Sequence, residues 1–295
     1  MLLLRILEIL FPIFTIIAIA YFYTRHRPTD MRVANRLNID IFTPALLFSV
    51  LADKSFNIAE YQQLAIGGAV IILGSGLLAY PFVRWGKLPF KVFLPPMMFT
   101  NTGNMGLPLV LFSFGEQGLP AAVMLFVVEN TLHFSVGVYM LDHRAPVWQV
   151  LKLPIIIATL LGLLVSILQI VIPPTLITPI KMLGQISVPL MLFGLGVRLL
   201  DIDLNDWRIG LLGAVVCPVA GVGVFLLITP WLHLSPIQQG ILLVFAVLPP
   251  AVLNYMMAEK YHLEPHKVAS IVLLGNVMSV ISIPCALVFA LPKPV

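Results

Sequence analysis

Long apolar stretches alternate with short polar segments along the whole chain. Each stretch has about 20 residues, which is the length that an α-helix needs to cross a bilayer. The first stretch is too long for the apolar region of a cleaved signal peptide, so we expect it to be a span. The pattern predicts an all-α polytopic membrane protein with ten transmembrane helices. They cover residues 3–23, 34–52, 62–83, 90–114, 119–141, 149–171, 177–199, 208–231, 237–259 and 267–291.

The composition agrees with this pattern. Of 295 residues, 60% are hydrophobic and only 10% are charged, whereas about 25% of the residues of a soluble domain are charged. So little charge excludes a cytosolic enzyme, a nucleic-acid-binding protein and a disordered chain. Cys217 and Cys285 both lie inside apolar stretches, and we expect two buried free thiols.

Basic residues are distributed unevenly between the two sets of loops. Most of the 17 Lys and Arg residues flank the odd-numbered loops. The positive-inside rule then predicts that these loops face the cytoplasm. Both termini would lie outside the cytoplasm, in a protein of the cell (inner) membrane. The basic residues expected on the outer side are Arg5, Lys54, Lys181 and Lys293.

The two halves of the chain resemble each other weakly. A shift of about 146 residues places Asn130 on Asn276, and ThrProAlaLeuLeuPhe (43–48) resembles ValProLeuMetLeuPhe (188–193). Five spans per copy is an odd number, so the second copy enters the membrane inverted. Inverted repeats are typical of transporters, whose substrate site lies at the repeat interface. The predicted repeats are 1–142 and 146–295.

Two of the predicted spans contain residues that break helices, at matching repeat positions 100–108 and 246–254. Glycine, proline and polar residues disfavour a continuous helix there. The second half of a broken helix begins with free N–H groups, which attract an anion. We therefore predict a carboxylate site where the two spans cross, although both breaks could instead be kinks that only help packing. The candidate substrate-binding residues are Asn101, Thr102, Gly103, Asn104, Pro108, Pro249, Pro250 and Asn254.

Neither break contains an acidic residue. A cation–proton antiporter needs a carboxylate at such a crossover to hold its cation. The composition of the breaks therefore favours an anion as substrate, and no metal site or cofactor is expected.

Five residues within the spans are candidates for proton or ion coupling. Glu129 lies near the middle of a span, where an acidic residue is costly and by default functional. His133 follows one helical turn later and could share its proton, although the pair could equally be a structural hydrogen bond. Asp40 could be a gate or could simply pair with Arg36 at the membrane interface. The remaining candidates, Asn130 and Asn276, line a cavity or join helices.

The strings AsnThrGlyAsnMetGlyLeuPro (101–108) and ProProAlaValLeuAsn (249–254) resemble the auxin efflux carrier family over essentially the whole chain. The resemblance implies the fold of bile-acid sodium symporters and an elevator mechanism. It also implies a scaffold of helices 1, 2, 6 and 7, through which two copies form a homodimer. The transport domain would be helices 3–5 and 8–10, with Asn104 and Asn254 holding the carboxylate. The long hydrophilic central loop of the plant exporters is absent here.

These observations predict a secondary active carrier that exports a small organic carboxylate, such as an auxin-like or dicarboxylate anion. The membrane potential alone favours anion export, by about 2.3 kcal/mol per charge at 100 mV. A proton-coupled carrier and a sodium-coupled symporter of the bile-acid type both remain open. A membrane sensor that binds the anion without transporting it is a third reading. No credible nucleophile and base occur together, so an enzyme is not expected.

Overall fold

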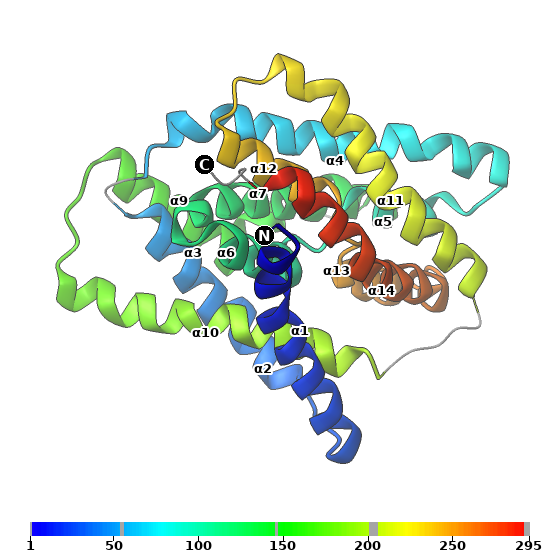
Figure 1. Ribbon diagram of the computed structural model, residues 1–295, viewed down its shortest axis with the longest axis horizontal. Helices are drawn as coiled ribbons and strands as arrows, with labels where there is room; N and C mark the ends of the chain where they lie inside the picture. Colours follow the sequence, from blue (N-terminus) through cyan, green and yellow to red (C-terminus); the bar gives the residue numbers. More distant parts are fainter. Residues whose placement is uncertain (1, 54–55, 145–146, 201–205, 292–295) are drawn as a thin grey trace.

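The computed structural model describes residues 2–53, 56–144, 147–200 and 206–291 (Figure 1). Lys54 and Lys293, which the charge pattern places on the outer side, lie outside these residues. The described chain is helical, and its only β-type feature is an isolated bridge between Thr100 and Pro250. The predicted all-α fold class is therefore confirmed.

The first half of the chain contains several helices that are interrupted or change type. Their order and bounds are α1 (Leu2–His26), α2 (Arg32–Leu37), η1 (Asn38–Phe42), α3 (Thr43–Leu51), α4 (Ile58–Gly86), α5 (Phe90–Met98), η2 (Thr102–Gly106), α6 (Leu107–Phe114), η3 (Glu116–Gly118), α7 (Leu119–Leu132), η4 (His133–Gly137) and α8 (Val138–Leu141).

The second half contains three long helices and one helix that is broken into α12 and α13. Its elements are η5 (Val147–Lys152), α9 (Pro154–Ile167), α10 (Pro174–Arg198), α11 (Trp207–Ile228), η6 (Thr229–Trp231), α12 (Pro236–Ala246), α13 (Val252–Lys260) and α14 (Pro265–Ala290).

Within the described residues, six helical stretches are long and apolar enough to cross a membrane. The protein is thus a multi-pass membrane protein. Of the other four predicted spans, 90–114 and 237–259 are interrupted at their breaks, 149–171 contains the 14-residue helix α9, and 34–52 is helical through α2, η1 and α3 with a π-helical segment inside. The count of ten spans stays a prediction. The six long stretches are Leu2–His26, Ile58–Gly86, Glu116–Leu141, Pro174–Arg198, Trp207–Trp231 and Pro265–Ala290.

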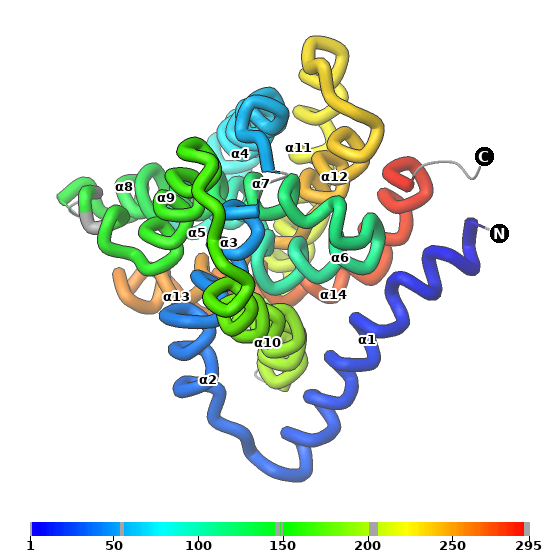
Figure 2. Tube along the Cα trace, turned by 90° about the vertical axis from the view of Figure 1, so that its left-hand side faces the viewer, coloured from blue at the N-terminus to red at the C-terminus, as the bar shows by residue number. Residues whose placement is uncertain are grey.

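The helices pack in two groups. In the first, α1 packs along α10, and α3 packs between α9 and α10. In the second group, α11 packs along α14 and α4, and α4 also contacts α5 and α7. Figure 2 shows α1 and α10 on one side of the molecule, and α4, α11 and α12 on the other. The site described below lies between these groups.

Glycines allow the closest contacts inside both groups. A Cβ on Gly196 of α10 would lie 2.3 Å from the carbonyl oxygen of Ile17 in α1. A Cβ on Gly221 of α11 would lie 2.0 Å from the carbonyl oxygen of Ala246, the last residue of α12. Small residues let helix backbones approach in this way in membrane proteins.

Many large apolar side chains are exposed, as expected where lipid takes the place of water. Cys217 is a buried free thiol, as predicted, but Cys285 is exposed, so the prediction that both are buried was wrong. The error has a simple cause, because an apolar neighbourhood in sequence does not tell whether a membrane helix turns a residue toward protein or lipid.

In Figure 2 the start of α1 and the end of α14 lie on the same side of the molecule.

Candidate functional site

The two interrupted helices meet at their breaks. Residues 99–101, after α5, run antiparallel to residues 249–251, which precede α13. The N–H of Ala251 donates to the carbonyl of Phe99 at 3.0 Å, and the N–H of Asn101 donates to the carbonyl of Pro249 at 2.7 Å. Unwound backbone in a membrane must find such partners within the protein. Pro249 and Pro250 add no N–H groups of their own, which reduces the number of donors to satisfy.

Three asparagine side chains strengthen this junction. Asn254 donates from Nδ2 to the carbonyls of Phe99 at 2.9 Å and Ala251 at 3.0 Å. Asn101 donates from Nδ2 to the Oδ1 of Asn276 at 3.3 Å, and Asn276 donates from its own Nδ2 to the carbonyl of Val272 at 2.7 Å. All three asparagines are buried. The bonds from Asn254 to Phe99 and from Asn101 to Asn276 join segments that are distant in sequence, so these residues hold the two breaks in register.

A cavity of about 170 Å³ lies beside this junction. Asn101 to Asn104 form one part of its lining, and Glu129, Asn130 and His133 form another. Ala251, Val252 and Leu253 close it from the second break. The first helix group supplies the opposite wall, with Asn35, Asn38, Thr43, Ile155, Met191 and Arg198.

π-Helical turns are concentrated at this cavity. The described residues contain three such segments, η1, η2 and η4, and each contributes to the cavity lining. Two of the segments are followed closely by proline, at Pro44 and Pro108. Proline cannot donate a backbone N–H to the carbonyl four residues earlier, which leaves the carbonyls of Asp40 and Asn104 without their α-helical partner. π-Bulges occur frequently at functional sites, so their convergence marks this cavity as the candidate site.

Backbone donors at two helix starts line the cavity. Among the described residues, no hydrogen bond is formed to the backbone N–H of Gly103 or Asn104 at the start of η2, nor to that of Val252 or Leu253 at the start of α13. These four residues belong to the cavity lining. The first N–H groups of a helix carry partial positive charge. Two helix starts, one from each half of the chain, therefore meet at one cavity.

Glu129 is buried and fully bonded. Its Oε2 accepts a hydrogen bond from Thr102 Oγ1 at 3.0 Å, and its Oε1 lies 3.1 Å from Nδ1 of His133. The His133 ring stacks on Phe99, with 4.2 Å between ring centroids. Both side chains are at most 4% exposed. The predicted Glu129–His133 contact is thus present, and it ties α7 and η4 to the first break.

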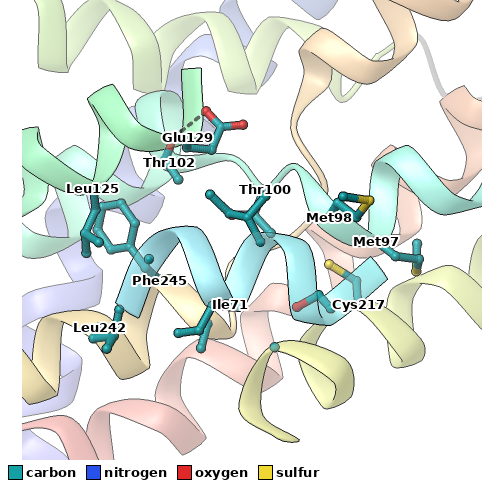
Figure 3. Close-up of a pocket in the computed structure, with 15 residues that line it drawn as sticks. Ile71, Met97, Met98, Thr100, Thr102, Leu125, Glu129, Cys217, Leu242 and Phe245 are labelled. Carbon is teal, nitrogen blue, oxygen red and sulfur yellow. Dashed lines mark hydrogen bonds between the residues drawn. The ribbon is translucent and has the colours of Figure 1, made fainter. Parts of the chain in front are cut away.

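A second, smaller cavity lies behind Glu129. Its volume of about 20 Å³ is enough for roughly one water molecule. Figure 3 shows Glu129 and Thr102 hydrogen-bonded to each other at one edge, with Thr100 beside them and Ile71, Leu242 and Phe245 below. Thr100, Thr102 and Glu129 line both cavities, so they form the wall between them.

The structure brings together most, but not all, of the predicted site residues. Asn101, Thr102, Gly103, Asn104, Glu129, Asn130 and His133 line the larger cavity. Pro108, Pro249, Pro250, Asn254 and Asn276 are not among its lining residues, and the last four build the junction behind it. Asp40 is exposed and pairs with Arg36 at 3.5 Å, which agrees with an interfacial role.

Sequence reasoning missed the wall that the first helix group supplies. The charge pattern includes Arg198 only among the basic residues that flank the odd-numbered loops, and the sequence analysis names neither Asn35 nor Asn38. A signal was present for Asn38, because it is a polar residue in an apolar stretch, six positions before a proline. The sequence gives no such signal for Arg198, since the ends of membrane helices commonly carry arginine.

Fold and site together define a multi-pass helical membrane protein with a polar cavity at two helix breaks. The model of a family described as "Membrane transport protein" matches residues 5–150 and 143–287. The chain belongs to this family, and the resemblance to auxin efflux carriers is confirmed.

Curated relatives align along most of the chain. An uncharacterized transporter of Methanocaldococcus jannaschii is 22% identical, covering 85% of this chain and 87% of its own length. A protein of Rhizobium meliloti, named "Putative malonate transporter", is 22% identical over 95% of this chain and 94% of its own. An uncharacterized transporter of Methanothermobacter thermautotrophicus is 25% identical over 86% and 87%. All three names describe transporters.

Proposed function

We propose that this protein is a secondary active carrier that exports a small organic carboxylate. The observation that carries the proposal is the meeting of two helix starts at one cavity. The N–H groups of Gly103, Asn104, Val252 and Leu253 supply positive potential without a formal charge. A carboxylate bound there accepts hydrogen bonds from both halves of the chain. The name of the Rhizobium meliloti relative, which mentions malonate, agrees with such a substrate.

Asn104 is the side chain best placed to bind the substrate directly. It lines the cavity, is half-buried, and forms no hydrogen bond with another described residue. The amide of Asn101, by contrast, is engaged by Asn276. Asn254 contributes indirectly, because its hydrogen bond to Phe99 fixes the start of α13 against the first break.

Glu129 couples transport to protons in this proposal. Its carboxyl group lines the same cavity as the bound carboxylate, and two negative charges at close range repel each other strongly in a medium of low dielectric constant. Substrate binding and protonation of Glu129 therefore favour each other, so a proton travels with the anion. The membrane potential then favours export only of an anion that keeps a net negative charge with its proton. His133 and the water-sized cavity behind Glu129 offer the proton a partner and a route.

We further propose that the two helix groups move relative to each other as an elevator. The first group, built from α1, α3, α9 and α10, is the scaffold, through which two copies form a homodimer; the second carries both breaks. A third cavity, of about 480 Å³, lies at the Lys181 end of α10, whereas the site lies at the Arg198 end. Cavities at both ends of one helix suit alternating access. The two successive family matches support the inverted repeat.

Sodium coupling is the second candidate mechanism. Thr102 Oγ1 and Glu129 lie together at the wall between the cavities, and oxygen atoms of this kind bind hard cations. This candidate predicts that transport requires sodium, whereas the proton mechanism does not.

The test is solid-supported-membrane electrophysiology on purified protein in liposomes. A panel of monocarboxylates and dicarboxylates is applied with and without sodium, and with and without a pH gradient. A carboxylate-evoked current without sodium, lost in Asn104→Ala, supports the proposal. A strict sodium requirement would replace proton coupling by the symporter mechanism. Binding of a carboxylate without flux in either direction would favour a sensor.

A further inference from the structure

We propose that unpaired amide oxygens in the cavity select carboxylates that also carry a hydrogen-bond donor, namely a hydroxyl or an ammonium group. Asn130 is the main determinant of this selectivity, and Asn101 and Asn38 contribute to it. The inference rests on the proposed function, because it presumes that the carboxylate of the ligand occupies the helix starts. It concerns the group that accompanies this carboxylate.

The amide of Asn130 has a fixed orientation. Its Nδ2 donates to the carbonyl oxygen of Phe126, one turn earlier in α7, at 2.8 Å. The amide cannot be turned over, because its Oδ1 would then face a carbonyl oxygen, and neither atom can donate. No described residue donates to the Oδ1 of Asn130.

This oxygen is open to the cavity. The Asn130 side chain lines the cavity and is only 7% exposed. Its Oδ1 is nevertheless not one of the fully enclosed polar atoms that lack a partner. A ligand in the cavity can therefore reach it.

The amide of Asn101 is oriented by a chain of hydrogen bonds. Asn276 donates from Nδ2 to the carbonyl of Val272, so it presents its Oδ1 to Asn101. Asn101 meets this oxygen with its Nδ2, which leaves its own Oδ1 without a partner among the described residues. Asn101 also lines the cavity, directly before the start of η2. The first break thus adds a second acceptor.

A third unpaired amide oxygen belongs to the opposite wall. The side chain of Asn38 is 7% exposed and lines the cavity, and its Oδ1 has no hydrogen-bond partner among the described residues. An unpaired buried acceptor is costly. A donor supplied from the cavity removes this cost.

The chemistry of these oxygens defines the ligand group that they bind. An ionised carboxylate accepts hydrogen bonds and donates none, so it cannot pair with an amide oxygen. A hydroxyl group donates one hydrogen bond, and an ammonium group donates three. Asn101 adjoins the start of η2, where the carboxylate binds in the proposed function. A donor on the carbon next to the carboxylate is therefore best placed to pair with these oxygens.

Two matched ligand series test this requirement. Propionate, lactate and alanine have nearly the same size, and the carbon next to their carboxylate carries hydrogen, hydroxyl or ammonium. Malonate, tartronate and aminomalonate repeat the comparison with two carboxylates. Binding is measured by calorimetry on the purified full chain. In at least one series, the hydroxyl or the ammonium member should bind about 10- to 100-fold more tightly than the plain carboxylate, which leaves the acceptors unpaired. The tighter of the two identifies the donor.

Asn130→Leu removes the acceptor at nearly constant volume. The preference for the donor-bearing ligand should fall at least about tenfold, while the affinity for the plain carboxylate stays within about twofold. The helix loses little, because the carbonyl of Phe126 keeps the backbone N–H of residue 130 as its partner within α7.

Thr131→Val is the matched control. Thr131 follows Asn130 in α7 and donates in the same way to the carbonyl four residues earlier, that of Val127, at 2.7 Å. It is exposed and does not line the cavity, so the preference should not change. If Asn130→Leu fails to fold, Asn38→Leu replaces it, because Asn38 Oδ1 has no partner to lose. The preference should fall in that variant too.

Two outcomes overturn the inference while the proposed function stands. In the first, the wild-type protein binds plain carboxylates at least as tightly as the hydroxyl and ammonium members of both series. In the second, a preference exists but Asn130→Leu changes it no more than Thr131→Val does. If the wild-type protein binds no carboxylate of any kind, both proposals fall together.

Discussion

Asn254 in α13 donates a hydrogen bond to the carbonyl oxygen of Phe99 at 2.9 Å, across 155 positions of sequence. The carbonyl of Phe99 also accepts the N–H of Ala251. One oxygen atom of the first break thus holds two groups of the second. The unwound segments are therefore a rigid junction, and the cavity beside it has a fixed wall.

This relationship separates the expected effects of two asparagine variants. Asn254→Ala removes a donor from buried carbonyl groups, and such a loss costs about 1 to 3 kcal/mol. Its thermal unfolding in detergent should shift to lower temperature, and substrate binding should weaken as well. Asn104→Ala should weaken binding at least about tenfold with unchanged unfolding, because Asn104 has no described partner to lose. Equal unfolding curves for both variants and the wild type would refute the structural role of Asn254.

Replacing Glu129 tests proton coupling. Glu129→Gln keeps the size and the hydrogen-bonding ability of the side chain but cannot take up a proton. Transport by this variant, measured in liposomes between pH 5 and 8, should lose its dependence on a pH gradient. Glu8→Gln is the control, because Glu8 is exposed on α1 and is not a lining residue of any of the three cavities described above. A Glu129→Gln variant with the wild-type pH profile would show that the residue is structural.

Two neighbouring glycines of α11 differ in what surrounds them. A Cβ on Gly221 meets backbone at 2.0 Å, whereas on Gly223 it meets only the end of the Leu78 side chain at 3.2 Å. Gly221→Ala should therefore push α11 away from α12 and destabilise the protein by about 1 to 3 kcal/mol. Gly223→Ala should be nearly neutral. Thermal unfolding of the two purified variants checks this, and similar losses in both would contradict the packing described.

The orientation in the membrane follows from the charge distribution and can be tested with single cysteines. In a background of Cys217→Ala and Cys285→Ala, Arg27→Cys should be protected from a membrane-impermeant maleimide applied to intact cells, because the positive-inside rule places it in the cytoplasm. Thr175→Cys, exposed in the first turn of α10, should be labelled. The reverse pattern would invert the topology, with the termini inside.

Local sequence was sufficient to predict the features whose residues all lie within one helix. The long apolar stretches predicted membrane helices, and glycine and proline marked both breaks. The spacing of Glu129 and His133 placed them one turn apart, and the structure has them in contact at 3.1 Å. Such features depend on the period of the α-helix and on the chemistry of neighbouring residues, which a sequence states directly.

Other features depend on how separate helices are placed. The hydrogen bond from Asn254 to Phe99 and the place of Arg198 in the cavity lining could not be predicted from the sequence. That Asn254 binds the substrate stays a prediction. The exposure of Cys285 was likewise not readable from its apolar neighbours. Sequence by itself determined a helical membrane protein with two breaks and a buried acid. Only the tertiary structure decided which side chains face the cavity, because that depends on the rotation of each helix and on contacts between residues more than one hundred positions apart.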